Sequence, residues 1–134
     1  MSFISDLQYG EEGESTLMEF LGGVCEKPTK QRLKDYDFKH IDSGHFYEVK
    51  RDRLAPETGN IAVELAFKGN PSGVTHTKAD WMVYIIGESF YRISPKALLA
   101  LTTDVRKVMG GDGWKSQLAL VKLEDFKNEA ELLI

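Results

Sequence analysis

The chain has 134 residues, of which 42% are apolar and 28% charged, and its formal net charge is −4. This length predicts one domain, residues 1–134, and the composition is that of a folded globular protein rather than a disordered chain. No apolar run approaches the roughly 18–20 residues that a membrane helix needs. The N-terminus also has no basic segment followed by an apolar one. We therefore expect a cytoplasmic protein with no membrane partner.

The charge is unevenly distributed. Residues 27–123 carry 16 basic and 11 acidic side chains, whereas residues 1–26 carry six acids and no base. A basic middle is compatible with a surface that binds phosphate groups, although mixed charge on a solvated surface has the same signature. The single cysteine, Cys25, excludes an internal disulfide and a cysteine-based zinc site, and we expect it to fill the core.

A helix is predicted to begin near Gly13 or Glu14, after an N-terminal arm (residues 1–9) and a glycine-containing break. Its apolar stripe repeats with helical spacing, and Gly22-Gly23 lies near its end: Leu17, Phe20, Leu21, Val24. Glu14 belongs to the side of this helix that carries the stripe. Its carboxylate either complements the helix dipole or points to a functional site.

A polar, basic connector (residues 26–35) leads to a predicted β-hairpin. Residues 36–41 and 45–52 have the composition and alternation of strands, and Asp42-Ser43-Gly44 is a turn sequence. The period of two places one set of side chains on one strand face, Phe46, Glu48, Lys50, Asp52, and the other set on the opposite face, His45, Tyr47, Val49, Arg51. In register, Asp37 comes close to Glu48 and Lys50.

A loop (53–59) and a third strand (60–68) follow the hairpin. Glu64 lies among small residues on one face of this strand, and it is either a paired glutamate under close packing or a further carboxylate of the site. Residues 69–80 form a loop rich in turn residues. Its Ser72, Thr77 and Lys78 either hold a phosphate or DNA backbone, or belong to an ordinary surface loop.

The remaining segments predict further regular structure. Ser94-Pro95 is a helix-initiating pair, and Gly110-Gly111 is expected to stop that helix rather than to cradle a phosphate. The predicted elements are strands at 81–86, 90–94 and 118–123, a helix at 95–109, and an acidic tail or short last helix at 124–134. The chain carries no two-histidine helical zinc spacing, nucleophile elbow, Walker loop or dinucleotide fingerprint.

Asp37, ten intervening residues and then Glu48-Val49-Lys50 resemble the Asp-x(n)-Glu-x-Lys signature of the PD-(D/E)XK nuclease superfamily. Tyr36 stands where the motif has proline. The resemblance covers about residues 14–86 and leaves 87–134 as a peripheral strand-helix-strand segment. It implies an α/β, restriction-endonuclease-like fold with a central mixed β-sheet flanked by helices. The fold's crossover helix would then have to fit within residues 69–80.

The resemblance also implies an activity. Asp37 and Glu48, with the main-chain carbonyl of Val49, would hold Mg²⁺, for which Mn²⁺ can substitute. Lys50 would orient or deprotonate a water or neutralise phosphate charge, and Glu14 would complete the cluster. The implied protein is a DNA endonuclease similar to small phage- or virus-encoded nucleases and Holliday-junction resolvases of DNA recombination. We expect its substrate to be branched DNA and its form to be a homodimer, paired through 81–86 or 95–109.

Two other functions and one structural alternative stay open. A non-catalytic nucleic-acid-binding or assembly module could retain the nuclease fold, and a restriction-type enzyme would show sequence preference on duplex DNA. Alternatively, the acidic and basic residues of the hairpin form only surface ion pairs, each of which contributes little.

Overall fold

The computed structural model describes the backbone of residues 3–134 and the side chains of residues 12–111 and 113–134. Its helices are α1 (Phe3–Leu21), α2 (Ala55–Thr58), α3 (Pro95–Leu101) and α4 (Leu123–Glu129), with short 3-10 turns η1 (Lys30–Arg32), η2 (Gly73–Thr75) and η3 (Asp112–Trp114). Its strands are β1 (Cys25–Glu26), β2 (Phe38–His40), β3 (His45–Arg51), β4 (Asn60–Phe67), β5 (Asn70–Pro71), β6 (Trp81–Ile86), β7 (Ser89–Ile93), β8 (Lys107–Gly110), β9 (Ser116–Lys122) and β10 (Glu131–Leu132).

The strands form two sheets. The first has the order β1-β2-β3-β6-β7-β10, and it is mixed because β3 and β6 run parallel while its other pairs are antiparallel. The second has the order β5-β4-β9-β8 and is antiparallel throughout. The expected α/β class with a mixed central sheet is therefore confirmed.

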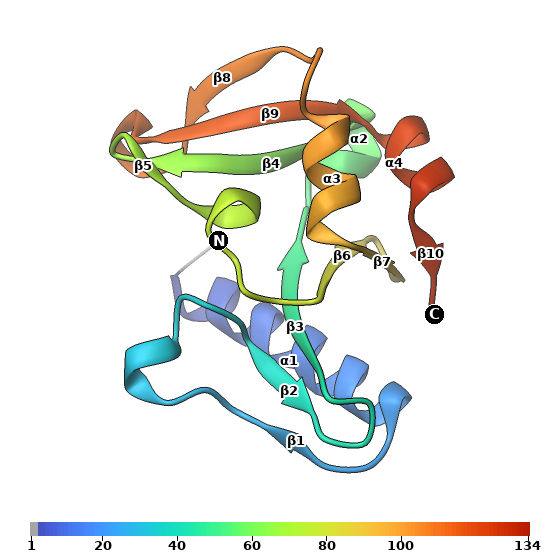
Figure 1. Ribbon diagram of the computed structural model, residues 1–134. Coiled ribbons are helices and arrows are strands. Elements are labelled where there is room, and N and C mark those ends of the chain that lie inside the picture. Colours follow the sequence, from blue (N-terminus) through green and yellow to red (C-terminus); the bar gives the residue numbers. More distant parts are fainter. Residues whose placement is uncertain (1–2) are drawn as a thin grey trace.

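The first sheet lies in the middle of three layers, with α1 on one face and the second sheet on the other (Figure 1). Strand β6 shows the division, because successive side chains of a strand point to opposite faces. Val83 and Ile85 pack in a core with Leu17 of α1. Met82 and Tyr84 pack in a second core with residues of β4 and β9. Both faces of β6 are buried, which accounts for its unbroken apolar sequence.

Strand β3 divides its side chains as the sequence predicts. Tyr47 and Val49 belong to the core beneath α1. Glu48 and Lys50 lie on the opposite face and line a cavity together with Glu64 of the second sheet. The hairpin thus directs its charged residues into the space between the two sheets.

Helix α1 begins at Phe3, so the predictions of an N-terminal arm and of a helix start near Gly13 are wrong. Gly13 lies inside the helix and is buried, and a Cβ atom there would collide with Ile85 of the first sheet. The glycine that reads as a helix break is therefore the point of close approach between helix and sheet.

Helix α3 ends at Leu101, so the prediction of a helix to residue 109 is wrong. The predicted start is confirmed, because Ser94 Oγ accepts a hydrogen bond from Ala97 N at 3.1 Å. The stop comes from two threonines: Thr102 Oγ1 donates to Leu99 O at 2.6 Å and Thr103 Oγ1 donates to Ala100 O at 3.0 Å. These hydroxyls satisfy carbonyls of the last turn, and residues 107–110 form strand β8 instead.

Strand β4 belongs to the second sheet and not to the central one. The connection between the parallel strands β3 and β6 therefore contains α2, β4, β5 and η2, where a crossover helix was expected. The predicted alternation along β4 also fails beyond Glu64, where the pairing with β9 shifts register. Strict alternation would place Phe67 on the same face as Ile61, but Phe67 is 43% exposed whereas Ile61 is buried.

The C-terminal third is built into both sheets. Strand β9 pairs along β4, and Val121 and Phe126 are buried in the core between the sheets. This differs from the predicted core at 14–86 with a peripheral remainder. The acidic end forms α4, as one of the two predicted alternatives. Strand β6 is paired on both edges and buried from Met82 to Ile86, so it cannot supply a dimer interface in the folded chain.

Candidate functional site

Asp37 sits where β2 and β3 separate. Its backbone N donates to Tyr47 O at 2.8 Å, which extends the ladder by one step beyond β2. Its side-chain Oδ2 then accepts a hydrogen bond from Val49 N at 2.6 Å. The N–H and C=O groups of one strand residue point to the same edge. The Val49 carbonyl is therefore directed to the edge of β3 at which the Asp37 carboxylate lies.

Glu48 is held in the space between the sheets. The residue is 7% exposed, and its Oε1 accepts a hydrogen bond from Thr77 Oγ1 at 3.2 Å. The Lys50 ammonium lies 3.8 Å from Oε2 and forms an ion pair with it. No hydrogen-bond donor among the described side chains and backbone reaches the buried Oε2 atom. A buried carboxylate oxygen in this state is costly unless something else coordinates it.

The surroundings of Asp37 and Glu48 disfavour the charged forms of both carboxyl groups. Burial raises the pKa of Asp37, against the hydrogen bond from Val49 N and the positive charges of Lys50 and Lys27. Burial also raises the pKa of Glu48, against Lys50 and Thr77, and the charges of Asp37 and Glu64 raise it further. Repulsion between desolvated carboxylates, which the Lys50 ammonium offsets only in part, is an arrangement that a bound cation relieves.

Glu64 faces the hairpin from the second sheet. Its Oε2 accepts a hydrogen bond from Ser72 Oγ at 2.6 Å, and its Oε1 accepts one from Ser116 Oγ at 3.0 Å. Both oxygens thus have partners, which matches the predicted paired glutamate. Its charge nevertheless raises the pKa of Glu48, and it lines the same cavity.

These groups line a cavity of about 810 Å³ between the sheets. Its walls carry three carboxylates, three lysines, a histidine and two serines among their residues: Asp37, Glu48, Glu64, Lys34, Lys50, Lys68, His76, Ser72 and Ser116. The volume falls within the usual range of ligand sites. The mixture of acids in the interior and lysines around them suits a cation together with a polyanion.

The other sequence-predicted residues are distributed around this cavity. Ser72 lines it, and Thr77 supports Glu48 from within rather than offering its hydroxyl to a ligand. Lys78 is exposed and does not line it. Glu14 lies on α1, beyond the opposite face of the first sheet, and its Oε1 accepts a hydrogen bond from Lys27 Nζ at 3.0 Å. Lys27 therefore acts on both residues, because it forms an ion pair with Glu14 and its positive charge lowers the pKa of Asp37.

Sequence reasoning missed Lys27, His76 and Ser116. Lys27 belongs to the basic connector, and the sequence pattern there indicates no specific partner for it. His76 Nε2 lies 3.5 Å from Asp35 Oδ1 and borders the cavity. Ser116 reaches Glu64 from β9, a strand far away in the sequence. Only the spatial pairing of β4 with β9 brings it into the site, and no local pattern signals that pairing.

The donor set fits a hard divalent cation. Asp37 and Glu48 supply carboxylate oxygens, and the Val49 carbonyl lies at the same edge, which are the ligand types that Mg²⁺ and Mn²⁺ prefer. The buried Glu48 Oε2, without a hydrogen-bond donor in the described part of the chain, is the atom best placed to coordinate. Within that part, no three or more histidine, cysteine, aspartate or glutamate side chains gather as a metal site. The ion would therefore be coordinated by two carboxylates, one main-chain carbonyl and water.

The raised pKa values predict a pH-dependent effect of Glu48→Gln on stability in metal-free protein. A raised folded-state pKa means that the folded chain binds more protons than the unfolded one, so the carboxyl's stabilising contribution is present at low pH and is lost as pH rises through its folded pKa. Glu48→Gln should therefore increase the free energy of unfolding at pH 8, and this gain should shrink toward pH 5. Urea unfolding in EDTA measures it, with Glu88→Gln, in an exposed turn, as the control. A gain that grows as the pH falls would contradict the assignment.

The described helices include none with both the length and the apolar character needed to cross a bilayer. A comparison of the chain with protein-family models, curated proteins and solved structures finds no match.

Proposed function

We propose that this chain is a divalent-metal-dependent DNA endonuclease built on a PD-(D/E)XK-like core. The observation that carries the proposal is the convergence of Asp37, Glu48 and Lys50 on one cavity, with two desolvated carboxylates of raised pKa and a buried carboxylate oxygen that no described donor reaches. Perturbed carboxyl groups that meet in a cleft are typical of catalytic sites.

The order of elements supports the resemblance. Counting β1 as the first strand, Asp37 precedes the second and Glu48-Val49-Lys50 lies on the third, after helix α1. Strand β6, the fourth of this sheet, lies parallel to β3. The departure is the crossover, in which α2, β4, β5 and η2 stand in place of a helix. Strand β4 brings Glu64 to the site, where the resemblance has no corresponding residue.

Each residue then has a chemical task. Asp37, Glu48 and the Val49 carbonyl would hold the ion, and Thr77 fixes the Glu48 carboxylate through its hydroxyl. The bound ion supplies Lewis acidity, which polarises a phosphate and acidifies water. Lys50, held against Glu48 at 3.8 Å, offers an ammonium to a phosphate oxygen or to the attacking water. Lys34 and Lys68 at the cavity wall would attract the DNA backbone.

The direct test is a cleavage assay of the wild-type protein. We expect it to cut DNA in Mg²⁺ or Mn²⁺ and not in EDTA, with junction, flap and single-stranded DNA cut in preference to duplex. A duplex cut at one sequence would instead indicate a restriction-type enzyme. If none of the four DNAs is cut with either metal while the protein still binds them, the nucleic-acid-binding alternative replaces the enzyme. A homodimer remains a prediction, for which sedimentation of the pure protein is the measurement.

A further inference from the structure

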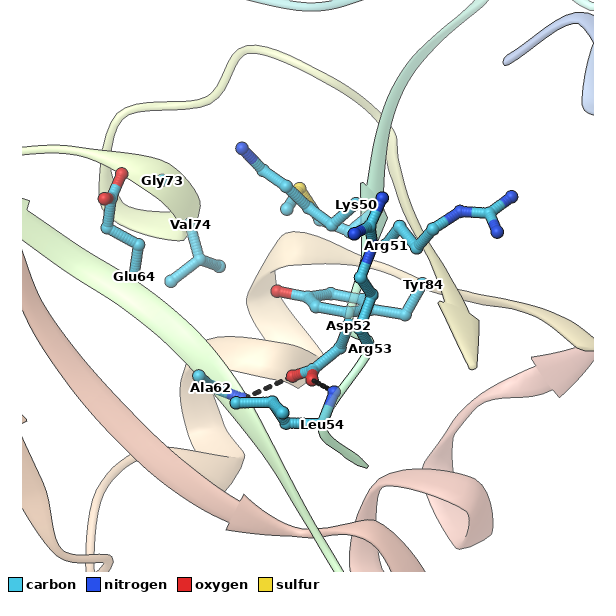
Figure 2. Close-up of a pocket in the computed structure, with 11 residues that line it drawn as sticks. Lys50, Arg51, Asp52, Arg53, Leu54, Ala62, Glu64, Gly73, Val74 and Tyr84 are labelled. Atoms are coloured by element: carbon cyan, nitrogen blue, oxygen red, sulfur yellow. Dashed lines mark hydrogen bonds between the residues drawn. The ribbon is translucent and has the colours of Figure 1, made fainter. Parts of the chain in front are cut away.

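A second cavity of about 580 Å³ adjoins the carboxylate site (Figure 2). It opens between the end of β3, strand β4 and turn η2, and it is lined by Lys50, Arg51, Asp52, Arg53, Leu54, Ala62, Glu64, Gly73, Val74, Met82 and Tyr84. Lys50, Glu64 and Gly73 also line the first cavity. The two cavities therefore meet at the lysine that we assign to phosphate chemistry.

The wall of this second cavity combines an apolar part with five charged residues and the Tyr84 hydroxyl. Leu54, Ala62, Val74 and Met82 supply its apolar part. The Tyr84 hydroxyl points into it from the first sheet (Figure 2). Burial raises the pKa of Tyr84, so this hydroxyl is neutral and can both donate and accept a hydrogen bond. An apolar wall beside a limited number of polar and charged groups is typical of sites for small organic ligands.

Both carboxylate oxygens of Asp52 accept hydrogen bonds from the backbone. Its Oδ1 accepts hydrogen bonds from Leu54 N at 3.1 Å and Ala55 N at 3.0 Å. Its Oδ2 accepts one from Ala62 N at 2.9 Å (Figure 2). The carboxylate thus connects the end of β3 to α2 and β4 and has a structural role. Besides the apolar side chains and the Tyr84 hydroxyl, the cavity is lined by charged side chains that are mostly basic: Lys50, Arg51, Arg53 and Glu64.

Gly73 allows turn η2 to pack directly against β4 where the two cavities adjoin. Its φ of +58° is in the left-handed region, and a Cβ atom there would collide with the backbone of Glu64. A larger residue would therefore strain the turn and push η2 away from β4. Close packing of this turn on β4 places Val74 in the second cavity, and Ser72 on Glu64 in the first.

We propose that the second cavity receives the base and sugar of the nucleotide next to the phosphate that is cut. This inference rests on the proposed nuclease function and specifies its substrate: DNA in which that nucleotide is unpaired or has been extruded from the helix. A paired base is stacked and cannot enter a pocket, so a branch point or single strand pays a smaller unstacking cost.

The first test measures binding without cleavage. Deoxyadenosine monophosphate is titrated into ¹⁵N-labelled protein in EDTA, and the amide signals of Leu54, Ala62 and Val74 should shift. Ala62→Phe should weaken this binding by about tenfold or more, because Ala62 is exposed at the cavity wall and phenylalanine fits a strand there. Leu54→Trp is a second occluding variant at a residue that is 63% exposed. Gln117→Phe, exposed on β9 and outside both cavities, should bind like wild type.

Two results would overturn the inference. One is that deoxyadenosine monophosphate shifts none of these amides, or that Ala62→Phe and Leu54→Trp bind it as wild type does. The other is that inorganic phosphate reproduces the same shifts, which would make the cavity a phosphate site. Cleavage separates this inference from the nuclease proposal. If wild type and Ala62→Phe cut branched DNA equally, the proposed nucleotide pocket is excluded and the proposed nuclease function is retained. If the nucleotide binds and no DNA is cut, the nuclease fails and a nucleotide pocket remains.

Discussion

Replacing Glu48 with glutamine is expected to lower the rate of metal-dependent DNA cleavage by a factor on the order of 10³ or more. The amide keeps the size of the side chain and an oxygen that accepts the hydrogen bond from Thr77, which lies 3.2 Å from Oε1. It removes the negative charge and the buried Oε2 atom assigned to the metal. The initial cleavage rate on branched DNA at saturating Mg²⁺ measures the effect.

The fold provides a matched control for this substitution. Glu88 is exposed in the turn between β6 and β7, away from both cavities, so Glu88→Gln should retain the wild-type rate. The far-ultraviolet circular dichroism of Glu48→Gln should equal that of wild type, because desolvation already disfavours the carboxylate in the fold. A Glu48→Gln protein that is folded and cuts DNA at more than a tenth of the wild-type rate would exclude Glu48 as a metal ligand.

Replacing Lys50 with alanine should lower the cleavage rate by roughly 10²–10⁴-fold, the usual cost of losing a proton-transfer or charge-stabilising group. The Lys50 ammonium lowers the pKa of both carboxyl groups, so its loss raises those pKa values further, and at low pH more of the protein is protonated at the carboxylates that would bind the metal. A Mg²⁺ titration of the cleavage rate separates the chemical role of Lys50 from its effect on the carboxyl pKa values. A group that acts on the phosphate or the water leaves the rate low even when the metal is saturating.

Lys39→Ala is the corresponding control, since Lys39 lies on β2 over the Phe46 ring and outside both cavities. It should cut DNA as wild type does. Full recovery of Lys50→Ala at high Mg²⁺ or higher pH would show that Lys50 only adjusts the carboxylates and takes no part in the chemistry. A rate that stays low at saturating Mg²⁺ and at high pH is the expected result.

The hairpin that carries the site could be predicted because its signals are local. Alternation along β3 assigns Tyr47 and Glu48 to opposite faces, and the structure places them so. Asp42-Ser43-Gly44 occupies the turn, and Gly44 has a φ of +73°, which glycine adopts without strain. Asp37 falls one residue before β2, where it meets Val49.

The second sheet could not be predicted from such signals. Strand β4 pairs with β9, whose residues are distant in the sequence, and the alternating pattern of β4 fits either sheet equally well. Val108 and Met109 have helical spacing from Leu101, but the Thr102 and Thr103 hydroxyls end the helix first. The pairing of β4 with β9 gives Glu64 its hydrogen bond from Ser116, and the packing of the two sheets places Glu64 in the same cavity as Glu48. Neither contact can be predicted from the local sequence.

The most direct test of the central claim is a crystal structure of the protein soaked in Mn²⁺, with the ion located by its anomalous scattering. The proposed site predicts one peak in contact with carboxylate oxygens of Asp37 and Glu48 and with the Val49 carbonyl, and its loss in Glu48→Gln crystals. Mn–O distances of about 2.1–2.2 Å are expected, close to those of Mg²⁺. A Mn²⁺ peak elsewhere, or no peak between these two carboxylates at saturating Mn²⁺, would contradict the assignment of a metal-dependent nuclease site.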